Sequence, residues 1–156
     1  MNKRICCFIG HRKIAVTKEL ETRLYSIIVN LILKENINTF LFGSKSCFNS
    51  LCYEKVSIAK EKYLSIKRVY VRAEYPIIDE SYKKYLLERY EDTYYPENIL
   101  KSGKAAYIKR NYYMIDKSDI CVFYFDENNL PQNRKSGTKI ALDYAIKKNK
   151  KIILIP

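Results

Sequence analysis

The 156-residue chain contains no tryptophan and only one histidine, His11. A metal site or catalytic group that needs two histidines is therefore excluded, which leaves His11 as a candidate lone general base. No run of about 18 apolar residues is present, and the first residues lack the charged, apolar and small-residue pattern of a secretory signal. We therefore expect a cytoplasmic protein without a membrane segment.

Paired metal-ligand motifs are also lacking, although the chain has five cysteines. Three of them lie in apolar, strand-like runs, where a free thiol behaves as a small hydrophobic side chain. The other two have four residues between them and no second pair of soft ligands. We expect free, buried thiols, no metal and no cofactor, with the cysteines at Cys6, Cys7, Cys47, Cys52 and Cys121.

Acidic residues are few relative to basic ones, and the formal net charge is +12. The lysines are spread through every segment instead of forming one block, so the charge does not mark a localised nucleic-acid surface. Anionic ligands are favoured by this charge. A DNA-binding module is one alternative function, for which we expect only weak, non-specific association.

The first half of the chain alternates strand-like and helix-like segments. Ile5–Ile9 and Thr39–Phe42 are short, continuous apolar runs, typical of strands that are buried on both faces. Thr17–Lys34 repeats apolar residues at helical spacing between them, and a second such repeat over residues 48–63 precedes a third strand at Arg68–Val71. Short connections between such units predict a parallel sheet with helical crossovers.

The second half repeats this unit. A predicted helix over residues 104–116 precedes a strand at Ile120–Phe125, and a helix from Ser136 to Lys148 precedes a last strand at Ile152–Ile155. The whole chain, 1–156, therefore reads as one Rossmann-like, doubly wound α/β domain. We predict a mainly parallel sheet of five strands in the order 3-2-1-4-5, with helices on both faces and a ligand at the carboxyl ends of the strands.

Between the two halves, residues 75–103 read as a helical and loop insertion. It contains a predicted helix at Ser81–Tyr90 with Asp79 or Ser81 as its cap, followed by a turn-rich stretch over Glu91–Gly103.

Three predicted strand ends turn polar at glycine or serine. A glycine lets backbone N–H groups approach a ligand closely, and the N-terminus of a helix favours phosphate. The most telling break is Ser136–Thr138, because it opens the last predicted helix. The three breaks contain Gly10, His11 and Arg12; Gly43, Ser44 and Ser46; and Ser136, Gly137 and Thr138.

The predicted helix over residues 104–116 has two distinguishable faces. One is an apolar stripe of Ala105, Ile108, Tyr112 and Ile115. The neighbouring face places Arg110 and Asn111 together, where they would hold a phosphate and a ribose or base edge. Asp126, at the end of the following strand, is a candidate acceptor for a ribose hydroxyl.

The order of these motifs resembles the SLOG superfamily, most closely its YpsA-like branch. The resemblance covers nearly the whole chain and rests on Phe8–Arg12, Phe42–Ser44, Tyr107–Asp116, Ser118-Asp119 and Ser136–Thr138. It implies a Rossmann-like domain that binds nucleotides or nucleotide-derived ligands. Relatives in this superfamily include DNA-processing proteins, the Lonely Guy phosphoribohydrolases and sensor domains for ADP-ribose-type signals.

The chain departs from the hydrolase branch of that superfamily at the catalytic acid. That branch has a helix arginine, which Arg110 matches, and a glycine-rich loop followed within three residues by a glutamate. Here the first carboxylate after Thr138 is Asp143, five residues on and about 140° around the helix, so we expect it to face away from a phosphate at the first turn. Glu74, after the third strand, is the other candidate acid.

We therefore expect a module that binds an adenine-nucleotide or ADP-ribose-like ligand, as a sensor or by sequestration, and that forms a homo-oligomer. The enzymatic alternative is an N-glycosidic hydrolase or transferase acting on nucleotides, with Arg110, Glu74 and Asp143 as candidate catalytic residues. The predicted ligand-binding residues are Gly10, His11, Arg12, Gly43, Ser44, Ser46, Arg110, Asn111, Asp126, Ser136, Gly137 and Thr138.

Overall fold

The helices and strands alternate along the chain, and their bounds come from a computed structural model that describes residues 2–129 and 136–156. Short 3-10 turns lie at Glu97–Ile99, Gly103–Ala105 and Glu127–Asn129. The main elements are β1 (Ile5–Gly10), α1 (Lys18–Leu33), β2 (Thr39–Phe42), α2 (Cys47–Lys62), β3 (Lys67–Val71), α3 (Glu80–Arg89), β4 (Asp92–Tyr94), α4 (Ala106–Lys117), β5 (Ile120–Tyr124), α5 (Gly137–Lys147) and β6 (Lys151–Ile155).

Within the described residues, six strands form one sheet in the order β4-β3-β2-β1-β5-β6, and every neighbouring pair is parallel. The predicted Rossmann-like α/β fold is confirmed, but the predicted number of five strands is wrong. The additional strand is β4, which lies inside the stretch Glu91–Gly103 that we predicted to be rich in turns. It has three residues, and all of them are exposed or half-buried, so it carries no apolar run that sequence reasoning could detect.

Polar contacts hold β4 against β3. The Arg68 guanidinium donates to both carboxylate oxygens of Glu91, with Nε–Oε1 at 3.0 Å and Nη2–Oε2 at 2.8 Å. Burial alone would raise the pKa of the Glu91 carboxyl, but the hydrogen bonds from Arg68 outweigh this effect and lower it. Further along, the Thr93 hydroxyl donates to the Tyr70 carbonyl at 2.8 Å. A bidentate ion pair just before β4 thus adds to the backbone pairing that attaches this strand.

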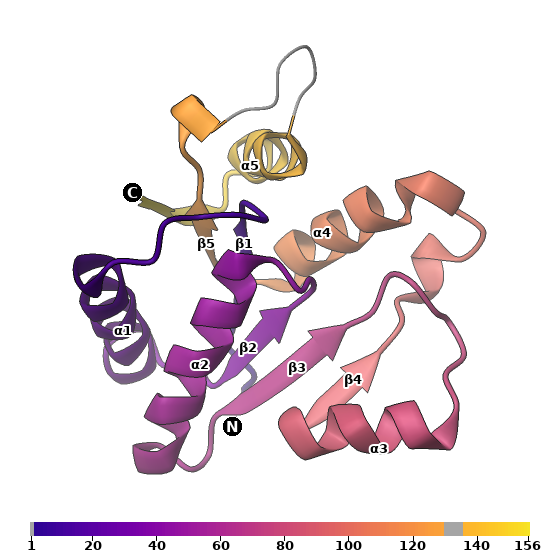
Figure 1. The fold of residues 1–156 in the computed structure, drawn as a ribbon, viewed down its shortest axis with the longest axis horizontal. Coiled ribbons are helices and arrows are strands. Elements are labelled where there is room, and N and C mark those ends of the chain that lie inside the picture. Colours follow the sequence, from indigo (N-terminus) through magenta and orange to yellow (C-terminus); the bar gives the residue numbers. More distant parts are fainter. Residues whose placement is uncertain (1, 130–135) are drawn as a thin grey trace.

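Helices lie on both faces of the sheet (Figure 1), and the sheet separates two apolar layers. One face, with Phe8, Phe40 and Val122, packs against α1, α2 and Leu86 of α3. The other face, with Cys7 and Phe123, packs against α4 and α5. Strands that are buried on both faces explain the continuous apolar runs of the sequence.

Side chains cap four helices at their N-termini. Thr17 caps α1 and Asp79 caps α3, which decides between the two predicted caps of that helix in favour of Asp79. Ser46 caps α2 and Ser136 caps α5, each accepting a hydrogen bond from the amide three residues further on. Both serine caps lie at the carboxyl edge of the sheet, where β1, β2 and β5 end.

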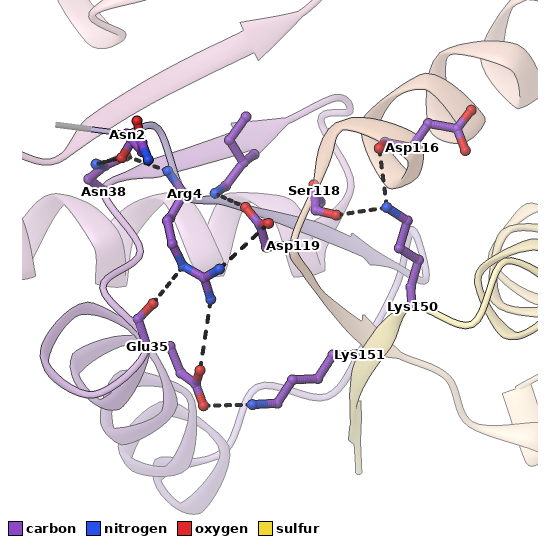
Figure 2. Close-up of polar contacts among 10 residues, drawn as sticks. Asn2, Arg4, Glu35, Asn38, Asp116, Ser118, Asp119, Lys150 and Lys151 are labelled. Carbon is purple, nitrogen blue, oxygen red and sulfur yellow. Dashed lines mark hydrogen bonds and ion pairs between the residues drawn. The ribbon is translucent and has the colours of Figure 1, made fainter.

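A network of charges closes the opposite, amino edge of the sheet (Figure 2). The Arg4 guanidinium lies 3.9 Å from Glu35 Oε2 and 3.7 Å from Asp119 Oδ1. Lys151 Nζ lies 2.6 Å from the other Glu35 oxygen, and Asp119 Oδ2 accepts from the Ile5 amide at 2.9 Å. These ion pairs therefore join residues that precede or begin β1, β5 and β6, and each charged side chain has a partner of opposite charge within the protein.

Among residues 2–129 and 136–156, no helix has the length and apolar character required to cross a membrane.

Candidate functional site

A cleft of about 900 Å³ opens at the carboxyl ends of β1, β2 and β3, between α2, α4 and α5. The structure brings ten of the predicted ligand-binding residues to this cleft: Gly10, His11, Arg12, Ser44, Ser46, Arg110, Asn111, Ser136, Gly137 and Thr138. Several lining residues were not predicted as ligand contacts, and these include Lys13, Lys45, Asn49, Tyr107 and Met114.

Three sequence-predicted residues do not line the cleft. Gly43 lies beside it and offers its carbonyl oxygen to Arg110. Asp126 uses its backbone N–H to hold His11, with a donor–acceptor distance of 2.9 Å. Asp143 forms an ion pair with Lys139 on the outer part of α5, at 3.0 Å. Of the two candidate acids, only Glu74 lies at the cleft.

Arg110 is the most unusual residue of the site because it is only 3% exposed. Its Nη1 group donates to the carbonyl oxygens of Gly43 and Val71, at the ends of β2 and β3, and its Nε donates to Asn111 Oδ1 at 3.0 Å. Its Nη2 group makes no hydrogen bond to the described part of the chain. The guanidinium is thus held from one side by the ends of two strands, and the other side remains for a ligand.

In the described part of the chain, the charge of Arg110 is not paired with a carboxylate. Within residues 2–129 and 136–156, no carboxylate lies within 4.0 Å of its guanidinium. Burial lowers the pKa of Arg110, while the more distant charge of Glu74 raises it. An arginine stays protonated at neutral pH even so. A buried charge without a counter-ion is costly, and an anion in the cleft would remove that cost.

The burial of Arg110 corrects the predicted orientation of α4. We predicted Ala105, Ile108, Tyr112 and Ile115 as the apolar stripe of this helix, but only Ile115 of this set is buried. The helix instead buries Ala106, Arg110, Met114 and Ile115. A positively charged side chain therefore occupies the centre of a core-facing stripe, which sequence periodicity cannot distinguish from an exposed position.

Gly43 is required for this placement of Arg110. A Cβ atom at position 43 would lie 2.8 Å from Arg110 Cδ and Nε and 2.9 Å from Met114 Cε, distances that real side chains do not tolerate. We predicted that Gly43 leaves room for a ligand. It instead leaves room for Arg110, which faces the ligand cleft.

The N-terminus of α5 lines the cleft. Ser136 Oγ accepts from the Lys139 amide at 3.0 Å, which leaves the amides of the first two helical residues, Gly137 and Thr138, without partners inside the helix. Among the described residues, a Cβ atom at Gly137 would meet nothing within 4 Å. Neither packing nor a left-handed backbone demands glycine at this position, and its absent side chain leaves room in front of the helix terminus.

The N-terminus of α2 is occupied by the protein itself. The Cys47 amide donates to the Arg12 carbonyl at 2.8 Å, and Ser46 Oγ accepts from the Asn49 amide at 3.1 Å. Ser44 Oγ accepts from the Ser46 amide at 3.3 Å. These contacts make α5, rather than α2, the helix terminus that can receive an anion.

Asn49 is a structural residue that sequence reasoning missed. It is 3% exposed, and its side-chain amide donates to the Phe8 carbonyl at 3.2 Å and accepts from the Gly43 amide at 3.4 Å. It thereby joins the carboxyl ends of β1 and β2 beneath the cleft. A polar residue on the buried side of a helix with strand ends nearby was the only signal for this role.

His11 has a structural role that conflicts with general-base catalysis. The residue is 6% exposed, and its Nε2 accepts the hydrogen bond from the Asp126 amide. The lone pair of Nε2 is therefore engaged, and the ring also packs 5.5 Å from the ring of Phe125. His11 lines the cleft, and its ring joins the ends of β1 and β5.

The five cysteines are free thiols, four of them buried. Cys7 and Cys121 are paired in register on β1 and β5, and a hydrogen bond between them lowers the pKa of Cys7. Within the described residues, no cluster of histidine, cysteine and acidic side chains has the composition of a metal site.

Neither a family model nor a curated protein matches this sequence. Two solved structures of the molybdenum cofactor carrier protein from Chlamydomonas reinhardtii resemble the fold. The first shares 14% identity, with a TM-score of 0.55 over 98% of this chain and 76% of the other. The second shares 16% identity, with a TM-score of 0.54 over 99% and 77% of the two chains. At such identities the likeness shows the Rossmann-like fold alone.

Proposed function

We propose that the protein binds a nucleotide or nucleotide-derived anion in the cleft at the carboxyl edge of the sheet, as a sensor or sequestering module. The observation that carries this proposal is Arg110, a buried guanidinium without a carboxylate within 4.0 Å among the described residues. A phosphate would supply the missing negative charge and accept hydrogen bonds in the planar geometry that a guanidinium offers.

Other features of the cleft support the same ligand class. The open terminus of α5 adds amide donors and a partial positive charge. Tyr107 lines the cleft, is 49% exposed and has its ring 5.8 Å from Arg110 Cζ, so a flat base has an aromatic surface beside the cation. The SLOG-like order of motifs also favours a ligand of the adenine-nucleotide or ADP-ribose type.

The fold neighbours add a second candidate ligand. They carry the molybdenum cofactor, so this cofactor belongs in any panel of ligands for the cleft. The hydrolase alternative is less supported, because Asp143 lies outside the cleft and Glu74 is the sole acid among its described lining residues.

Titration calorimetry tests the proposal with AMP, NAD, ADP-ribose, cyclic ADP-ribose isomers and the molybdenum cofactor. We expect at least one of them to bind the unmodified protein. Gly137→Val should abolish that binding with the fold intact by circular dichroism, because the new side chain enters open space at the α5 terminus. Lys147→Val, an exposed change at the other end of α5, is the matched control and should bind normally.

Two results would contradict the proposal. If Gly137→Val binds as well as the unmodified protein, the ligand lies elsewhere. If AMP incubated with the protein releases adenine over many turnovers, and an Arg110→Ala variant does not, the enzymatic alternative replaces the binding function. Mass spectrometry of small molecules released from the purified, denatured protein identifies a ligand outside the panel.

A further inference from the structure

Glu74 stands out in the candidate cleft because it is the one acidic side chain among the described lining residues. The charged neighbours that line the same cleft are cations, namely Arg12, Lys13, Lys45 and Arg110. Glu74 follows β3 by three residues and is exposed, and its side chain makes no hydrogen bond or ion pair within the described part of the chain. Its carboxylate oxygens are therefore available to a molecule in the cleft.

The backbone around Glu74 is fixed from both sides. On one side, the Arg72 amide donates to the Tyr94 carbonyl at 2.8 Å, as an extension of the β3–β4 ladder. On the other side, the Arg72 guanidinium donates through Nε to the Tyr75 carbonyl at 3.2 Å and through Nη2 to the Pro76 carbonyl at 3.4 Å. Arg72 is 8% exposed and is also held by Thr93. The hydrogen bonds of the buried Arg72 therefore fix the backbone on both sides of Glu74 and set its position.

Glu74 acts on Arg110 without contacting it. Its carboxylate is more than 4.0 Å from the guanidinium. Burial lowers the pKa of Arg110, and the charge of Glu74 is the largest of the effects that raise this pKa. A ligand phosphate on Arg110 would consequently have the Glu74 charge nearby. A carboxylate accepts hydrogen bonds from hydroxyl groups and repels a second phosphate in the same place.

We propose that Glu74 is a specificity-determining residue that accepts the hydroxyl groups of an unsubstituted ribose and rejects ligands with a further phosphate on that sugar. This inference rests on the proposed function, because it concerns the ligand of the same cleft. An acidic side chain beside the ends of parallel strands is a known physical solution for distinguishing a ribose hydroxyl from a ribose phosphate.

Calorimetry with matched pairs of probes tests this inference. AMP is compared with adenosine 2′,5′-bisphosphate, and ADP-ribose with its 2′-phosphorylated form. The unmodified protein should prefer the unsubstituted member of a pair by about tenfold or more. Glu74→Gln should reduce this preference by about the same factor, and Glu74→Lys should favour the 2′-phosphate. Glu61→Gln, which removes one exposed negative charge on α2 outside the cleft, should leave the preference unchanged.

The outcomes separate the two proposals. If the unmodified protein binds a probe but Glu74→Gln leaves the ratio of the two affinities unchanged, the role of Glu74 is refuted and the binding function stands. An unmodified protein that prefers the 2′-phosphorylated probes also refutes it. If no probe binds the unmodified protein, the proposed function fails and this inference fails with it. Glu74 is exposed and makes no side-chain hydrogen bond in the described residues, so its variants should keep the fold.

Discussion

The two edges of the sheet differ in whether their charged side chains lie near partners of opposite charge. At the amino edge, Arg4 and Lys151 lie near Glu35 and Asp119, so the charges are balanced inside the protein (Figure 2). At the carboxyl edge, the described residues leave Arg110 buried with no carboxylate in contact. Charges that are already balanced contribute to holding the strands together, whereas an unbalanced buried charge favours whatever anion can reach it.

The largest effect should come from neutralising one arginine at each edge. Arg110→Met removes the buried charge, and we expect ligand affinity to fall about a hundredfold or more. Arg4→Met should leave ligand affinity unchanged and lower the free energy of unfolding by no more than about 1 kcal/mol, because its ion pairs are partly exposed. Calorimetry and denaturant unfolding of both variants measure these quantities. An equal loss of affinity in the two variants would show that the edges do not differ in function.

A smaller effect should follow from moving Arg110 without removing it. Gly43→Ala places a methyl group against Arg110 and Met114, so we expect a loss of about 1–3 kcal/mol in the free energy of unfolding, together with weaker ligand binding. Gly137→Ala is the matched change at the same edge. It enters open space and should keep or slightly raise stability. Urea unfolding decides the point, and equal stability of the two alanine variants would contradict the packing argument.

The smallest effect concerns pH at the amino edge. The hydrogen bond and charge of Lys151, with a further contribution from Arg4, lower the pKa of Glu35 in the folded state. The stabilisation is therefore complete above the ordinary pKa of glutamate, about 4.3, and is lost as the pH falls through the lowered value. Lys151→Met should make the loss of stability between about pH 5 and 3 less steep. An unchanged acid limb in unfolding curves would show that this pair does not contribute.

Much of the fold follows from the sequence because parallel strands and their helices carry strong periodic signals. The apolar run of β2 was predicted with its bounds as observed, and the bounds of α1 differ by one residue at each end. By contrast, the side-chain contacts of Arg68, Glu91 and Thr93 at β4 join residues more than twenty positions apart in the chain. No local pattern encodes such a strand.

The candidate site also has a part that the sequence predicted and a part that it did not predict. Strand ends and a serine cap can be read from the sequence, so most of the predicted residues lie at the cleft. The orientation of α4 could not be read, because an arginine on a helix is ordinarily solvated and Arg110 is buried only through the space at Gly43. Asn49 and Arg72 were missed for a similar reason, since their partners are backbone carbonyls that only the folded chain brings near.

The central place of β1 has a consequence for the order of assembly. Its two neighbours differ greatly in distance along the chain, because β2 follows after one helix but β5 begins at residue 120. During synthesis, β1 to β3 can assemble while one edge of β1 still exposes its backbone donors and acceptors. The sheet face with Cys7 and Ile9 is then still without α4 and α5. Completion of the sheet must wait for a late, non-local strand, which slows folding and makes the half-built sheet the species most prone to aggregate.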